Sequence, residues 1–114
     1  MRKLFVAAVL LSALASCQTQ NSLYTWYNSE DATYAYTKKG TEETLNEAML
    51  QYEKVINNQR GLRRAVPPGV NAEYGFLLYK AGKKNEGLKF LQAEIQAYPE
   101  SEQFISRIIK QLEK

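Results

Sequence analysis

The fold of this protein is decided by residues 70–99, VNAEYGFLLYKAGKKNEGLKFLQAEIQAYP. Residues 68–81 predict a helix that is apolar on almost every side, as expected of a central helix buried by several neighbours. Gly82 ends this helix, and Asn85 is predicted to cap a second helix over 85–98. Two helices joined by so short a turn pack antiparallel. The second helix carries three apolar residues on one face: Leu88, Leu91 and Ile95.

Helical patterns also precede and follow this stretch, and we predict further helices over 29–38, 41–57 and 101–113. Ser101 is predicted to cap the last of them. The apolar residues recur at helical spacing. In 41–57 they are Leu45, Ala48, Met49, Tyr52, Val55 and Ile56, and in 101–113 they are Phe104, Ile105, Ile108, Ile109 and Leu112, which we expect to face inward. No strand pattern competes anywhere in the sequence, so the predicted fold class is all-α.

Residues 70–99 resemble a tetratricopeptide repeat, a helix–turn–helix unit of about 34 residues. Aligning the closing proline of that motif with Pro99 needs no gap. The positions that then match are Tyr74, Gly75, Leu78, Gly82, Gly87, Leu91 and Pro99. Gly75 and Gly87 fall where the two helices cross closely, and their lack of a side chain suits that crossing. Asn71 and Glu94 depart from the motif, since they stand where tryptophan and alanine are common.

A second, weaker unit lies before the first. Residues 46–56 look like the second helix of a repeat, with Ala48 as the small residue and Tyr52 as the large one. The helix over 29–38 would be its partner, and the helix over 101–113 would cap the array, because repeat arrays must cover their last apolar face. The resemblance implies a tetratricopeptide-like array of about two divergent helical hairpins with a C-terminal capping helix, spanning 29–114.

The chain begins like a secretory signal, with Arg2 and Lys3 followed by a short apolar run. Residues 14–17, LASC, resemble a bacterial lipobox. That resemblance implies a signal peptide over 1–16 and a lipidated Cys17, carrying diacylglycerol and usually a further acyl chain such as palmitate. Residues 17–28 would form the lipidated cysteine and an aromatic tether. The alternative is a signal peptide that contains a cysteine by chance. Gln18 follows the cysteine, and by analogy with enterobacterial sorting this favours the periplasmic face of the outer membrane.

The whole mature chain resembles a family of short Gram-negative lipoproteins of unknown function. Four segments carry this resemblance: YTWY at 24–27, PPGV at 67–70, AEYG at 72–75 and YPES at 98–101. Members tend to be encoded beside a lipoprotein similar to the curli export channel and another small lipoprotein. The resemblance implies a subunit of an envelope complex, with neighbouring lipoproteins as partners.

The residue inventory argues against catalysis. The sequence has no histidine and one cysteine, and no glycine-rich phosphate loop. We therefore predict no enzyme activity, no cofactor and no metal site. The net charge of +3 falls to +1 once Arg2 and Lys3 leave with the signal peptide. Without a basic stripe, we expect no binding to nucleic acid.

A binding groove is the functional alternative to catalysis. In tetratricopeptide arrays the first helix of each unit lines the concave face, which here implies Ala72, Phe76, Tyr79 and Lys80 as candidate partner-binding residues. They offer an apolar floor with one cation, suited to a peptide or a partner helix. The alternative is that Phe76 and Tyr79 are ordinary core residues.

Aromatic residues over 24–36 offer a second hypothesis, a lipoprotein that binds peptidoglycan or another small ligand. Stacking on sugars is one interpretation of these residues. The favoured one is that Trp26 and Tyr27 pack the N-terminal segment onto the helices as large apolar anchors. The loop arginines Arg60, Arg63 and Arg64 could contact lipid phosphates, although a solvated loop explains them as well.

Overall fold

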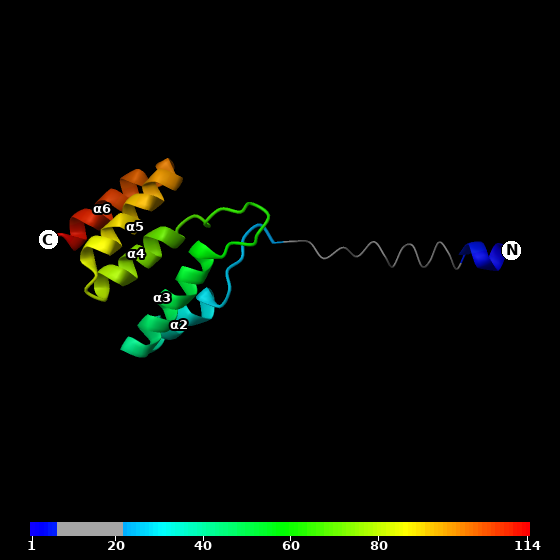
Figure 1. The fold of residues 1–114 in the computed structure, drawn as a ribbon, viewed down its shortest axis with the longest axis horizontal. Coiled ribbons are helices and arrows are strands. Elements are labelled where there is room, and N and C mark those ends of the chain that lie inside the picture. Colours follow the sequence, from blue (N-terminus) through cyan, green and yellow to red (C-terminus); the bar gives the residue numbers. More distant parts are fainter. Residues whose placement is uncertain (7–21) are drawn as a thin grey trace.

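The computed structural model describes residues 1–6 and 22–114 of the chain (Figure 1). Within residues 22–114 the elements follow in the order α2 (Ser29–Lys39), α3 (Glu42–Asn57), α4 (Val70–Lys80), α5 (Lys84–Ala97), a short 3-10 helix η1 (Pro99–Ser101) and α6 (Glu102–Leu112). The described residues contain no strand. The predicted all-α class is therefore confirmed.

Helices that follow one another in the sequence pack on one another in space. α2 packs on α3, α3 on α4, α4 on α5 and α5 on α6 (Figure 1). The chain thus forms two helical hairpins, α2–α3 and α4–α5, and α6 covers one side of the second hairpin. The predicted array of hairpins with a final helix has this arrangement, whereas the finer tetratricopeptide assignment stays a resemblance.

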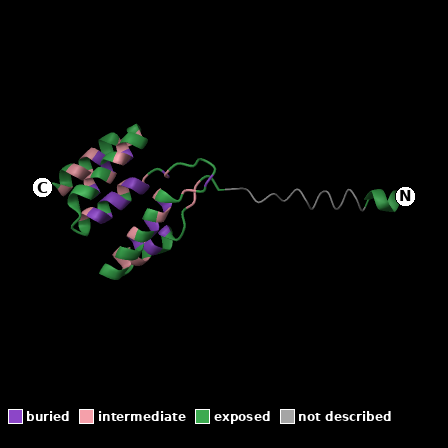
Figure 2. Cartoon of the chain, in the orientation of Figure 1, coloured by how far each residue is buried: buried purple, intermediate pink, exposed green. Residues whose placement is uncertain are grey.

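The core lies where α3 and α4 meet and is centred on α4. The buried apolar side chains that form it are Ala32, Ala48, Tyr52, Val55, Val70, Tyr74, Leu77 and Leu78. Buried residues occur on several sides of α4 (Figure 2). The prediction that the nearly all-apolar helix is the central one is confirmed, because only a position between neighbours removes so many apolar side chains from water.

The crossing of α4 and α5 depends on two glycines that face each other. A Cβ atom on Gly75 would lie 2.6 Å from the carbonyl oxygen of Gly87, and one on Gly87 would lie 2.5 Å from the carbonyl oxygen of Gly75. The two backbones are therefore in direct contact, as the sequence predicted. Leu78 and Leu91 are completely buried beside this contact.

Three predicted helix starts need correction. Asn85 does not cap α5: the turn after α4 closes when the Lys83 N–H donates to the Leu78 carbonyl (3.0 Å), so α5 already begins at Lys84. Pro68 lies in the turn before α4 and not in its first turn, because Gly69, with φ +90°, precedes the helix. Ser101 stands directly before α6, but its hydroxyl donates to the Tyr98 carbonyl (2.6 Å) and caps no α6 amide.

Phe104 does not face inward as predicted, because 67% of its surface is exposed. α6 is the last helix and packs on α5 and η1, so only part of its apolar face is covered. Ile105 takes the buried position. Phe104, Ile108 and Leu112 of α6 line a surface groove.

The segment before α2 is attached to the loop after α3 by hydrogen bonds. The Leu62 N–H donates to the Ser22 carbonyl (3.1 Å), and the side chain of Gln59 bonds both the N–H (2.5 Å) and the carbonyl (3.1 Å) of Thr25. A Cβ on Gly61 would overlap the Leu23 backbone, so the N-terminal segment and the loop after α3 are in direct backbone contact at this glycine.

The predicted aromatic anchors of this segment are less buried than expected. Trp26 is 39% exposed and Tyr27 is 42% exposed. Tyr27 contributes through its hydroxyl, which donates to the Asn58 carbonyl (2.5 Å). The prediction that apolar burial of these two rings fixes the segment is therefore wrong, since polar contacts with 58–63 hold it.

Candidate binding groove

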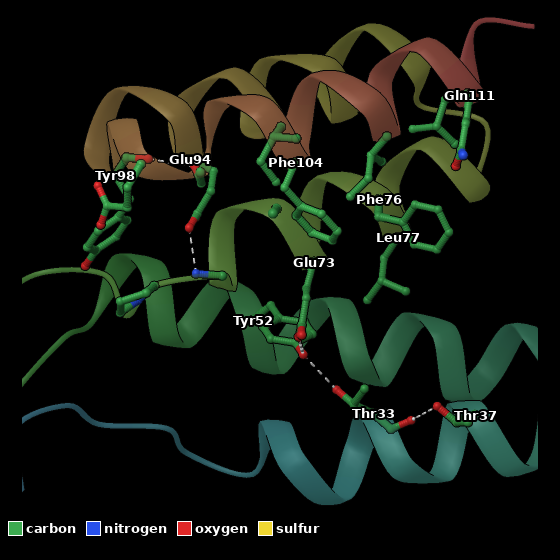
Figure 3. Close-up of a pocket in the computed structure, with 18 of the residues that line it drawn as sticks. Thr33, Thr37, Tyr52, Glu73, Phe76, Leu77, Glu94, Tyr98, Phe104 and Gln111 are labelled. Atoms are coloured by element: carbon green, nitrogen blue, oxygen red, sulfur yellow. Dashed lines mark hydrogen bonds between the residues drawn. The ribbon is translucent and has the colours of Figure 1, made fainter.

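An open apolar groove of about 790 Å³ runs between α2, α4 and α6 (Figure 3). α2 contributes Tyr36, α4 contributes Ala72 and Phe76, and α6 contributes Phe104 and Ile108. The groove exists because α6 covers α5 and leaves its own outer apolar positions facing α4. Exposed aromatic rings in a hollow of this size are typical of a surface that binds another molecule.

The four candidate residues from the sequence divide between the groove and its surroundings. Ala72 and Phe76 line the groove. Tyr79 does not: its hydroxyl donates to the Leu112 carbonyl (2.8 Å) and ties α4 to the end of α6. Lys80 is not part of the lining either, but its Nζ lies 5.5 Å from the centre of the Phe76 ring and 5.6 Å from that of Tyr36. The four candidate residues therefore do not form one lining surface, because the Tyr79 hydroxyl is taken up by the end of α6 and Lys80 lies beside the groove.

A polar chain crosses the floor of the groove and joins three helices. The Thr33 hydroxyl of α2 donates to the Tyr52 hydroxyl of α3 (3.1 Å), which in turn donates to the Glu73 carboxylate of α4 (Figure 3). Burial, and the hydrogen bond to Glu73, raise the pKa of Tyr52 to about 12. These bonds fix how α2 and α3 pack against α4, and no local sequence pattern predicts them.

One end of the groove is acidic. Glu94 of α5 is 2% exposed, and its Oε1 accepts a hydrogen bond from the Gly69 N–H (2.6 Å), at the start of α4. Its Oε2 is buried and has no hydrogen-bond partner among the described residues. Glu100 in η1 also lines the groove, and it follows Tyr98 by two residues in the chain. Sequence reasoning missed Glu94 as a site residue, although its departure from the repeat motif was a usable signal.

A second, smaller hollow of about 460 Å³ lies where the N-terminal segment meets α4 and α5. Tyr24, Arg63, Asn71 and Tyr98 line it. The Tyr98 hydroxyl donates to the Val66 carbonyl (2.6 Å), and burial together with Tyr24 raises the pKa of Tyr98. This hollow combines two aromatic rings with a cation and an amide.

Other predicted features have no counterpart in these two hollows. Trp26 and Tyr27 line neither of them, and Arg60 and Arg64 are exposed. Cys17, the predicted lipidation site, lies outside the described residues. Within the described ranges, no three His, Cys, Asp or Glu side chains lie close enough to hold a metal ion. None of the helices in those ranges has both the length and the apolar character needed to cross a membrane.

The fold and the groove define a small all-α domain of helical hairpins with an open apolar surface. The family model described as "Domain of unknown function (DUF4810)" matches residues 23–108, and the chain belongs to this family. The match begins within the N-terminal segment that packs on the loop after α3. No significant match is found among the curated proteins or the solved structures.

Proposed function

We propose that this protein is an outer-membrane lipoprotein, anchored through Cys17 on the periplasmic face, that acts as a scaffold or accessory subunit of an envelope export or assembly complex. The LASC sequence at 14–17 supports the anchor. The resemblance to small lipoproteins encoded beside a curli-export-channel-like protein supports the complex. Neighbouring lipoproteins are the proposed partners, and lipid is the proposed link to the membrane.

The single observation that carries the scaffold role is the apolar groove between α2, α4 and α6. Phe76 is 39% exposed and Phe104 is 67% exposed, and both line it. Water contacts these rings in the isolated chain, so a partner that covers them gains the hydrophobic free energy of their burial. An amphipathic helix or an apolar peptide is the kind of ligand that such a groove takes.

The test is affinity capture of the full-length protein from crosslinked envelopes, followed by mass spectrometry. We expect neighbouring lipoproteins to be captured, and we expect Phe76→Ala and Lys80→Glu to weaken that capture. Lys89→Glu is the matched control, because Lys89 is exposed on the outer side of α5 and does not line the groove. If neither Phe76→Ala nor Lys80→Glu alters any partner while both variants remain folded, the proposed binding surface is wrong.

A second candidate function is binding of peptidoglycan or another small ligand, and the smaller hollow favours it. Aromatic rings stack on sugars, and the Arg63 and Asn71 side chains offer polar contacts beside Tyr24. Purified peptidoglycan should then retain the protein, and Tyr24→Ala should reduce retention. Retention that depends on Trp26 and Tyr27 instead would place the sugar contact on the exposed aromatic rings outside the hollow.

A further inference from the structure

We propose that the groove selects an amphipathic segment of a partner protein that carries a lysine or arginine, and that this basic side chain pairs with Glu94. The inference rests on the proposed function, since it specifies the chemistry of the ligand in the same groove. It also fixes the direction of binding. The basic side chain lies at the end of the groove formed by α5 and η1, and the apolar side chains follow along α4 and α6.

Glu94 supplies the first reason. Its side chain is almost fully buried, yet only Oε1 has a hydrogen-bond partner, the Gly69 N–H. Buried polar atoms in folded proteins are nearly always hydrogen-bonded, and an unpaired carboxylate oxygen is costly. Capping α4 explains one oxygen of Glu94 and leaves the other unexplained. This oxygen is covered in the isolated chain, so the side chains around Glu94 must rotate as a cationic N–H donor of the partner arrives and satisfies it.

The distribution of charge supplies the second reason. Three carboxylates line the groove, on Glu73, Glu94 and Glu100, and no lysine or arginine is among the described residues that line it. Glu73 already accepts the Tyr52 hydroxyl. Glu94 lies beside Tyr98 in Figure 3, and Glu100 follows Tyr98 by two residues in η1, so both carboxylates belong to the Tyr98 end of the groove and attract an incoming cation there.

The opposite end of the groove carries the only nearby cation on α4. Lys80 Nζ stacks over Phe76 and Tyr36, both of which line the groove. In Figure 3, Glu94 and Tyr98 lie at one end, whereas Phe76 and Gln111 lie toward the other. A segment with its basic side chain at Glu94 therefore presents its other end to Lys80, where a carboxylate is favourable. A segment bound in the reverse direction would set like charges against each other at both ends.

The length of the groove limits the segment. α4, which forms its floor, has 11 residues, so at about 1.5 Å per residue it spans roughly 16 Å. A partner helix of about three turns covers this distance. Its apolar positions would contact Phe76, Phe104 and Ile108, and its basic residue would stand at the end beyond Phe104.

The experiment is a selection from a displayed library of 14-residue peptides with two fixed leucines one helical turn apart and all other positions randomised. The bait is the purified mature chain that remains after signal cleavage. We expect lysine and arginine to be enriched at least fivefold at one end of the bound peptides. Peptides selected on the Glu94→Gln protein should lack this enrichment of lysine and arginine but retain the apolar residues. Glu86→Gln is the matched control, because Glu86 lies on the exposed part of α5 and does not line the groove.

A selected peptide and its lysine-to-norleucine form then give a double-mutant cycle by fluorescence anisotropy. Loss of a charge-assisted hydrogen bond at a buried carboxylate weakens binding by roughly tenfold or more. We expect that loss for Glu94→Gln with the lysine peptide and less than a twofold change with the norleucine peptide. Glu100→Gln, at an exposed position, should weaken the lysine peptide by roughly two- to threefold.

The outcomes separate the two proposals. If no peptide binds the wild-type protein, the groove is not a binding site and the proposed function fails. If peptides bind without basic enrichment, or if the cycle shows no coupling between lysine and Glu94, the proposed function stands and the charge inference is overturned. Thermal unfolding shows whether Glu94→Gln weakens the fold. If it does, two comparisons on stable protein decide the question: the lysine peptide against the norleucine peptide on the wild-type chain, and Glu100→Gln against the wild-type chain.

Discussion

Replacing Gly75 by alanine tests the contact on which the fold depends. The added Cβ would lie 2.6 Å from the Gly87 carbonyl oxygen and 3.0 Å from the Leu91 amide nitrogen, where ordinary contact begins at 3.4 Å. Both of these neighbours are backbone atoms, so they cannot rotate away. The α4 and α5 helices must therefore separate by roughly 0.8 Å near the crossing, a gap large enough to lose a quarter or more of the local dispersion energy.

Two opposing terms set the expected magnitude. Overpacking a well-packed contact costs about 1–3 kcal/mol, whereas alanine gains about 1 kcal/mol over glycine inside a helix. Because backbone atoms lie on both sides of this contact, we expect an overpacking cost in the upper part of that range, about 2–3 kcal/mol. Less the gain of about 1 kcal/mol, Gly75→Ala should lower the free energy of unfolding by about 1–2 kcal/mol. For a domain of this size that corresponds to a fall in Tm of roughly 4–15 °C.

A double-mutant cycle identifies the contact as the cause. Gly87→Ala should act through the same separation of the helices, because its Cβ would lie 2.5 Å from the Gly75 carbonyl oxygen. The two substitutions should therefore cost less together than the sum of their separate effects. Gly82→Ala is the control: its φ of +91° makes alanine unfavourable, but its Cβ meets nothing within 4 Å. Gly75→Ala and Gly82→Ala should add to within about 0.5 kcal/mol.

The assay is urea and thermal unfolding followed by circular dichroism at the helical band. An unchanged or higher stability for Gly75→Ala would refute the close crossing, because an alanine without a steric clash is the better helix former. Strict additivity of Gly75→Ala and Gly87→Ala would refute the shared contact.

Three further predictions concern the groove floor, the N-terminal segment and the anchor. The pKa of Tyr52 is raised to about 12 from 10.0, so the stability that this protonated hydroxyl contributes is complete below pH 10 and is lost as the pH rises toward 12. The urea midpoint of the wild-type protein should therefore fall more steeply with pH across this window than that of Tyr52→Phe. Equal pH slopes for the two proteins would contradict the assignment. Gly61→Ala should displace residues 22–28 and speed hydrogen exchange at the Leu62 and Arg63 amides, with the helical signal unchanged; unaltered exchange would show that the segment does not pack at Gly61. Cys17→Ser should abolish incorporation of an alkyne-labelled fatty acid and release the protein from membranes, and labelling that persists would exclude the proposed lipidation site.

Helix positions were predictable from the sequence because their signals are local. The spacing of Leu45, Ala48 and Tyr52 predicts α3 without reference to any other part of the chain, and Thr41 caps that helix by accepting the Thr44 N–H (3.2 Å). The start of α5 was misplaced at Asn85 for a physical reason. A polar residue that can cap a helix does so only if the preceding turn delivers it to that position, and the turn at Gly82 closes two residues earlier.

Groove residues could be predicted from the sequence only where they share the face of a single helix. Ala72 and Phe76 share a face of α4 and both line the groove. Tyr79 does not line the groove, since its hydroxyl donates to the Leu112 carbonyl of α6, 33 residues later in the chain. Contacts such as Tyr52 with Glu73 join residues that are far apart in the sequence, so no local pattern reveals them.

The sequence alone determined that the fold class is all-α and that residues 70–99 form its central hairpin, and the resemblance to a tetratricopeptide repeat placed Gly75 and Gly87 at a close helix crossing. These features follow from apolar periodicity and from the absence of a side chain, which act within one or two helices. Only the tertiary structure decided that Phe104 is exposed in a groove and that Glu94 is buried with one oxygen unpaired. Both outcomes depend on which surfaces remain uncovered after α6 has packed on α5, and that is a property of the assembled helices.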